Sequence, residues 1–137
     1  MNARTLFERR FSCRSFDTTP LDRETVEAVL EAARWAPNGG NLQPWRFVVV
    51  LDSIRRRALA GAAYGQDFLA QAPVVITVCA VPDESATKYG PRGRELYCLQ
   101  DTAAAAQNIQ CPRWGRWIDE RDRSGALDCV AISVGNP

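Results

Sequence analysis

The sequence predicts an α/β or α+β domain in which helices alternate with central strands. Two apolar runs, residues 46–52 and 74–81, have the composition of buried strands, and segments with helical patterning flank and separate them. The chain has 137 residues, of which 46% are hydrophobic and 24% are charged, as in an ordinary globular protein. Because no repeat or linker divides it, we expect one domain over residues 1–137.

The first half of the chain predicts two helices and a strand. A short helix is expected over residues 2–9, followed by an extended segment over 11–17. Thr19 or Asp22 can cap a second helix over 21–35, whose apolar stripe consists of Val26, Val29, Leu30 and Ala33. The strand over 46–52, RFVVVLD, is apolar on both faces, which is typical of a strand covered on both sides.

The second half predicts further helices around the next strand. Ser53 can cap a helix over 54–63, and residues 66–71 predict a turn or short helix. The polar segment 82–93 is expected to be a loop, and a helix follows over 94–110, ended by Pro112. Its inner face is expected to contain Leu96, Leu99, Ala103, Ala106 and Ile109. The last ten residues, DCVAISVGNP, predict a third strand.

The stretch Thr102–Ala106, TAAAA, has almost no side-chain bulk. Another helix can therefore approach this backbone closely. Two interpretations are open: the stretch forms the seam between two subunits, or it packs in an ordinary core.

Charge and composition exclude several classes of function. The net charge is +1, so no overall field attracts nucleic acid or an anionic membrane. The apolar runs are too short to cross a bilayer, and the N-terminal residues lack the apolar core of a signal peptide, so we expect a cytoplasmic protein. Five isolated cysteines and no histidine indicate neither a metal site nor a disulfide framework. If the protein is an enzyme, it works without the commonest general base.

The N-terminal segment RRFSCRSF, residues 9–16, contains a candidate anion clamp. Arg10, Ser12 and Arg14 recur at a spacing of two, so an extended backbone projects all three to one side. Guanidinium groups offer paired donors that match phosphate oxygens. The alternative is a solvated cationic segment.

The loop APNGGNLQPW, residues 36–45, is unusually rich in special residues for a connector. Its two glycines allow close approach to the backbone, and its amides offer donors and acceptors, while a proline stiffens each end. The residues concerned are Pro37, Asn38, Gly39, Gly40, Asn41, Gln43 and Pro44. Such a loop suits a polar heterocycle, although a plain helix-to-strand connection is the alternative.

A third segment, KYGPRG at 88–93, is basic and glycine-containing, but it matches no known phosphate-loop pattern and is a weak signal by itself. Together the three segments predict an anionic ligand with a polar ring that needs no protein acid or base. Flavin mononucleotide (FMN) fits this description, because its ring itself carries hydride.

The ordered set of motifs resembles the nitroreductase family of FMN-dependent oxidoreductases. The motifs are RRFSCRSF, APNGGNLQPWRFVVV, FLAQAPVVITVCAV, YGPRGRELYCLQDTAAAAQNI and VAISVGNP. The resemblance implies an α+β fold with a mainly antiparallel central sheet flanked by helices, in an intertwined homodimer with FMN at the interface. It implies that Arg10, Ser12 and Arg14 hold the FMN phosphate and ribityl chain. It places Pro37, Asn38, Gly39, Asn41 and Gln43 at the flavin of the other subunit.

The implied activity is a ping-pong transfer. NAD(P)H gives hydride to the flavin, and a small-molecule acceptor of the nitroaromatic or quinone type then takes the electrons. No metal and no catalytic side chain are expected.

Residues 110–127 depart from the family pattern. The family has further helix and strand elements here, which would need on the order of forty residues, at typical element lengths. This chain has 18 residues, Gln110 to Leu127. We therefore expect weaker FMN retention than in an intact relative. Two alternatives to this activity stay open. One is a non-catalytic flavin- or nucleotide-binding protein, and the other is a degenerate chain without a ligand.

Overall fold

The computed structural model describes residues 4, 14–16, 18–110 and 134–135, and the fold is described for these residues. In chain order they form helix α2 (Arg23–Arg34), a 3-10 turn (Gly39–Asn41), strand β1 (Trp45–Val50), helices α3 (Ser53–Ala62) and α4 (Phe68–Gln71), strand β2 (Val75–Ala80), helix α5 (Pro82–Arg92), a π-helical turn (Gly93–Tyr97), helix α6 (Cys98–Gln110) and strand β3 (Val134–Gly135). The helix predicted over 2–9 lies outside these residues apart from residue 4, and the extended segment predicted over 11–17 is described only at 14–16. Most of the atypical region 110–127 also lies outside.

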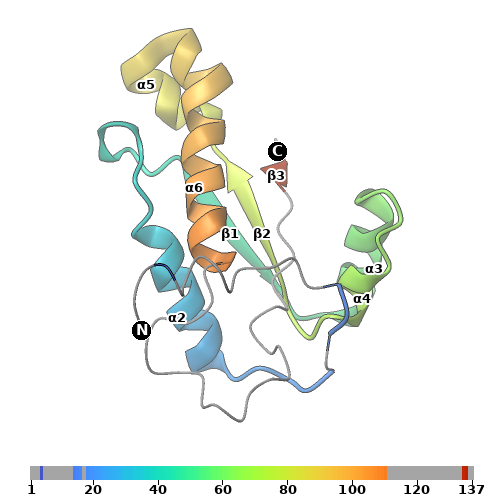
Figure 1. Cartoon of the computed structure of the whole chain (residues 1–137). Coiled ribbons are helices and arrows are strands. Elements are labelled where there is room, and N and C mark those ends of the chain that lie inside the picture. Colours follow the sequence, from blue (N-terminus) through green and yellow to red (C-terminus); the bar gives the residue numbers. More distant parts are fainter. Residues whose placement is uncertain (1–3, 5–13, 17, 111–133, 136–137) are drawn as a thin grey trace.

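The sheet is short and mixed, with the strand order β1-β2-β3 (Figure 1). β1 and β2 are antiparallel, in a register that pairs Trp45 with Ala80 and Val50 with Val75. β3 runs parallel to β2 and confirms a third strand at the end of the chain. Helices segregated around this sheet give an α+β fold, as the resemblance implies.

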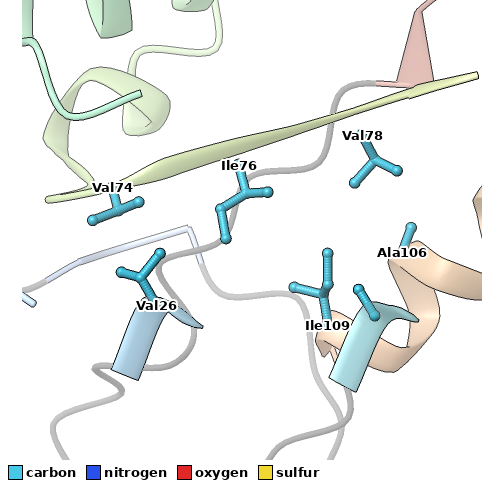
Figure 2. Packing of buried hydrophobic residues seen from close by; sticks show 7 residues of the cluster. Val26, Val74, Ile76, Val78, Ala106 and Ile109 are labelled. Atoms are coloured by element: carbon cyan, nitrogen blue, oxygen red, sulfur yellow. The ribbon is translucent and has the colours of Figure 1, made fainter. Parts of the chain in front are cut away.

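The main core lies between one face of β2 and the helices α2 and α6 (Figure 2). Successive side chains of a strand point to opposite faces, so alternate residues of the β2 segment enter this core. The buried cluster consists of Val26, Ala33, Val74, Ile76, Val78, Ala106 and Ile109. Each fully buried branched side chain of this kind stabilises the fold by roughly 1.5–3 kcal/mol.

The opposite face of the sheet is only partly covered. A smaller cluster of Val50, Ala72 and Val75, with Phe16 and Leu59 packed against it, covers one end of that face. Further along β1 the side chain of Val48 remains 49% exposed. The prediction that this strand is covered on both sides is therefore wrong for the described residues, because the helices α3 and α4 reach only the Val50 end.

The N-terminal cap of α2 agrees with the sequence prediction, whereas the cap of α3 differs from it. Asp22 caps α2, since its Oδ1 accepts the Thr25 N–H at 2.7 Å. The cap of α3 is Asp52 rather than the predicted Ser53, because Asp52 Oδ1 accepts the Arg55 N–H at 2.9 Å and Ser53 is the first helical residue. The short helix predicted within 66–71 is confirmed as α4.

The segment 82–93, predicted as a polar loop, is the helix α5. Pro82 occupies the first turn, where its missing N–H is not needed, and Asp83 and Glu84 favour the positive end of the helix. The helix kinks at Gly90, where φ is 55°. Gly93 then packs so closely that a Cβ there would lie 2.4 Å from the Ser85 carbonyl oxygen. Gly90, Pro91 and Gly93 thus allow the tight corner between α5 and the π-helical turn.

The predicted inner face of the 94–110 helix is only half right. Ala106 and Ile109 are buried, but Leu96 and Leu99 are 40% and 48% exposed, and Ala103 is exposed. The buried face contains Cys98, Asp101, Thr102, Ala105, Ala106 and Ile109. Small side chains let α6 approach the rest of the fold closely, and Leu99 of α6 and Leu96 of the preceding turn lie outside. Within Thr102–Ala106, the inner residues pack in the core, whereas Ala103 is left open.

Candidate functional site

The loop of residues 37–44 between α2 and β1 lies against α5 and α6 (Figure 1). Three of its residues have left-handed backbone conformations: Gly40 (φ 60°), Asn41 (φ 58°) and Gln43 (φ 51°). For a residue with a side chain this conformation costs roughly 1–2 kcal/mol, and Asn tolerates it best. Such strain persists only where the surroundings fix the backbone, so specific contacts must hold this loop.

Part of the amide set predicted to face a ligand binds the loop itself. Asn38 Nδ2 donates to the Ala36 carbonyl at 3.2 Å, and Asn38 Oδ1 accepts the Gln43 N–H at 2.9 Å. Gln43 Nε2 donates to Asn41 Oδ1 at 3.3 Å. Among the described residues, Asn41 Nδ2 and Gln43 Oε1 form no hydrogen bond, so one donor and one acceptor remain available on the loop.

Asp101 of α6 binds the start of the loop. The Gly39 N–H donates to both carboxylate oxygens, at 3.1 Å each. Asp101 is 8% exposed, and burial raises the pKa of its carboxyl, while the Gly39 hydrogen bond partly opposes that shift. Asp101, which lies 62 positions after Gly39 in the sequence, therefore fixes the backbone at the start of the loop.

Tyr89 of α5 packs against the same part of the loop as Asp101. A Cβ added to Gly39 would lie 3.2 Å from Tyr89 Cε2, and one added to Gly40 would lie 2.8 Å from the Tyr89 hydroxyl. The Tyr89 ring packs edge-on against Tyr97, with ring centroids 5.0 Å apart. Lys88 places its ammonium 5.5 Å from the Tyr89 ring centroid, and Gly40 lies beside it. The glycines therefore accommodate this aromatic and cationic corner.

The same helix α6 also holds the end of α2. Asn108 Nδ2 donates to the Ala32 carbonyl at 3.0 Å, near the end of α2. Asp101 and Asn108 are separated by about two helical turns. α6 thus holds both the last turn of α2 and the loop that follows it.

Among the residues that the structure describes, one of the two predicted groups of site residues is complete. Pro37, Asn38, Gly39, Asn41 and Gln43 share the loop described above, with Pro37 and Asn41 exposed. In the predicted phosphate clamp, Arg10 and Ser12 lie outside the described residues. Arg14 is described and exposed, and no hydrogen bond joins it to the loop in the part of the chain that the structure describes.

Sequence reasoning missed Asp101 and Tyr89 as parts of this site. A signal for Asp101 existed, because no other charged residue occurs between positions 96 and 110. A lone carboxylate in an Ala-rich helix is solvated or has a specific partner, and here it has the partner. Tyr89 gives no comparable signal, because its segment predicts a polar loop and the surrounding KYGPRG motif is weak by itself.

Two negative findings concern the described residues. They contain no helix that is both long and apolar enough to cross a membrane. They also contain no group of three or more metal-ligating side chains of the His, Cys, Asp or Glu types.

Comparison with known proteins decides the family. A profile of the nitroreductase family matches residues 7–66. A protein of Archaeoglobus fulgidus, provisionally named NADH dehydrogenase/NAD(P)H nitroreductase, is 34% identical over 137 aligned positions, which cover 96% of this chain and 75% of that protein. The chain belongs to the nitroreductase family.

Other known proteins match over smaller parts of their own length. An NADH dehydrogenase of Thermus thermophilus is 42% identical over 80 residues, covering 58% of this chain and 39% of that protein. The solved structure of an FMN-dependent nitroreductase of Clostridium difficile has a TM-score of 0.63 at 26% identity, covering 77% of this chain and 57% of that one. This chain therefore spans well under two thirds of the length of both relatives.

Proposed function

We propose that this nitroreductase-family protein is an FMN-dependent oxidoreductase. It uses NAD(P)H to reduce nitroaromatic or quinone-type acceptors in a ping-pong cycle. The observation that carries the proposal is the strained loop 37–44, in which Asn41 Nδ2 and Gln43 Oε1 form no hydrogen bond among the described residues. The Clostridium difficile relative is named as an FMN-dependent nitroreductase and the Thermus thermophilus relative as an NADH dehydrogenase, and these names support the cofactor and the electron donor.

The chemistry of the described residues fits FMN. The rim of the flavin ring alternates hydrogen-bond donors and acceptors, and the loop offers both kinds through Asn41 Nδ2 and Gln43 Oε1. Arg14 is exposed and can give paired donors to a phosphate. In the proposal Arg10 and Ser12, which lie outside the described residues, complete the phosphate clamp.

The protein's own contribution is binding and orientation. Bound FMN would supply the hydride and electron transfer. Pro37, Asn38, Gly39, Asn41 and Gln43 form the ring-facing loop, whose strained backbone is fixed before a ligand arrives. A fixed loop lowers the entropy lost on binding, and it holds reactants in the orientation that favours transfer. No side chain is required as a nucleophile.

We also propose that the protein works as a homodimer through the outer face of α6. Leu99 and Ala103 are exposed on this helix, at a spacing of four residues that aligns them on one side, and Leu96 is exposed in the π-helical turn before it. Burying this stripe in a second copy would remove apolar area from water.

The test measures flavin binding and turnover separately. The full chain is titrated with FMN, and NADH or NADPH oxidation is then followed with a nitroaromatic or a quinone as acceptor. The variant Arg14→Ala is expected to weaken FMN binding about tenfold by removing a phosphate partner. Arg57→Ala, which removes an exposed arginine of α3, is the matched control.

Three results can be distinguished. FMN-dependent NAD(P)H oxidation supports the proposal. Flavin that binds without being reduced identifies a non-catalytic binding protein, and a chain that binds no FMN refutes both. We expect FMN affinity below that of a relative with an intact version of this region, because residues 110–127 are shortened, and stoichiometric flavin in the purified protein would contradict this.

A further inference from the structure

Asp101 is a buried carboxylate whose burial needs an explanation. Its only hydrogen-bond partner among the described residues is the Gly39 N–H, and none of the ion pairs within that part of the chain includes it. A buried charge without a cationic partner is costly, and an apolar residue of similar size is often more stable at such a site. The pKa of Asp101 is raised by burial, which agrees with incomplete compensation. Fold stability alone therefore does not account for an Asp here.

The hydrogen bond to Asp101 lies directly before the strained part of the loop. Gly39 begins the 3-10 turn, and the left-handed residues Gly40, Asn41 and Gln43 follow within four positions. A Cβ added to Gly39 would lie 3.2 Å from Tyr89 Cε2 and 3.6 Å from Asp101 Oδ2, so the ring and the carboxylate border the same side of this residue. The backbone at Gly39 is therefore fixed by a hydrogen bond to α6 and packs closely against a ring from α5.

We propose that Asp101 is a positioning residue, which fixes the loop at the Gly39 amide and thereby holds the Asn41 and Gln43 amides ready for the flavin ring. Its function is to accept the Gly39 N–H; it does not touch the reacting atoms. The identity of the ligand rests on the proposed function above, whereas the action of Asp101 on the loop does not.

Amide hydrogen exchange of the 137-residue chain tests the loop without any ligand. Asp101→Ala removes the acceptor and is expected to speed exchange across residues 38–43 at least about tenfold, the size expected for loss of a hydrogen bond to a charged group. Asp101→Asn keeps an acceptor oxygen, so exchange should stay within about threefold of wild type. Glu95→Ala removes an exposed carboxylate from the turn that precedes α6 and is the matched control. The protection of α2 and β2 amides against exchange should be the same in all three variants as in wild type.

Flavin binding provides the second readout. The FMN dissociation constant should rise about tenfold in Asp101→Ala and recover in Asp101→Asn, and the visible circular dichroism of bound FMN should change only in the alanine variant. If wild type binds no FMN, the proposed function fails, while the exchange experiment still tests the action of Asp101.

Two outcomes would overturn the inference: wild-type exchange of the loop in Asp101→Ala, or an Asn variant as disturbed as the Ala variant. If Asp101→Ala does not fold, Asp101→Ser takes its place, because the serine oxygen is one bond nearer its own backbone and falls short of Gly39.

The wild-type protein offers a check without any variant. The Gly39 amide proton should resonate downfield of ordinary glycine amides, and a normal shift would also contradict the inference.

Discussion

A single methyl group at Gly40 is expected to disturb the ligand-facing loop directly. The backbone at Gly40 is left-handed, with φ 60°, and a Cβ built there would lie 2.7 Å from Lys88 Nζ and 2.8 Å from the Tyr89 hydroxyl. The lysine ammonium ends a flexible chain and can move at little cost. The Tyr89 ring cannot move as easily, because it packs edge-on against Tyr97. Gly40→Ala therefore combines backbone strain with a collision.

The two costs can be estimated separately. The left-handed conformation costs Ala roughly 1–2 kcal/mol, and the reduced freedom of the unfolded chain returns about 0.4–1 kcal/mol, which leaves about 1 kcal/mol. Displacing Tyr89 from its preferred rotamer adds about 0.5–1.5 kcal/mol. Gly40→Ala should thus lower the free energy of unfolding by about 2 kcal/mol.

Gly65 provides a matched control. It also has a positive φ, 73°, but nothing lies within 4 Å of a Cβ added there. Gly65→Ala should therefore cost only the backbone term, about 1 kcal/mol, and should leave FMN affinity unchanged. Urea unfolding of both variants, with FMN titration of each, measures the difference.

A double-mutant cycle isolates the collision. Tyr89→Phe removes the hydroxyl nearest the new methyl group, so in that background Gly40→Ala should cost about 1 kcal/mol less than in wild type. Equal destabilisation by Gly40→Ala and Gly65→Ala, with no coupling to Tyr89→Phe, would refute the reasoning.

Three further predictions concern the core, a cap and a charge. Ile76→Ala should destabilise the protein by about 2–5 kcal/mol in urea unfolding, because Ile76 lies in the centre of the main core, and a loss below 1 kcal/mol would contradict that placement. Asp52→Ala should lower the free energy of unfolding by about 1 kcal/mol, whereas Ser53→Ala should leave it almost unchanged. The reverse order would show that Ser53 caps α3. Burial raises the pKa of Asp101, so the native state keeps this proton to a higher pH than the unfolded chain does. Wild-type stability should therefore fall as pH rises from the ordinary Asp range through the raised pKa, whereas Asp101→Asn should lack that fall; matching pH profiles would show that Asp101 is not the cause.

The elements that could be predicted from sequence are those whose patterns are local. Val26 and Ala33 were placed on the inner side of a helix by their spacing, and the β-branched run of β2 indicated a buried strand. The cap of α2 was likewise one of two predicted residues, and Asp22 has the required oxygen. In each case the deciding information lies within a few positions along the chain.

The errors arose where tertiary contacts decide. Gly90 and Pro91 are typical of a loop, yet they form a helical corner because Gly93 can pack against the Ser85 carbonyl. The inner face of α6 was assigned by hydrophobicity, but small size and a hydrogen bond place Asp101 inward and Leu99 outward. For the site, the loop was identified by composition, whereas its partners on α5 and α6 lie 45 or more positions away from it.

The position of α6 links two properties of the protein that are usually measured separately. Its inner face holds Gly39 through Asp101 and Ala32 through Asn108, while its outer face carries the exposed Leu99. In the proposed homodimer, a second copy that orders this helix would also order the flavin-facing loop. Linkage is reciprocal, so flavin would in turn strengthen association by the same factor. FMN affinity should therefore rise with protein concentration, and dimer mass should rise when FMN is added.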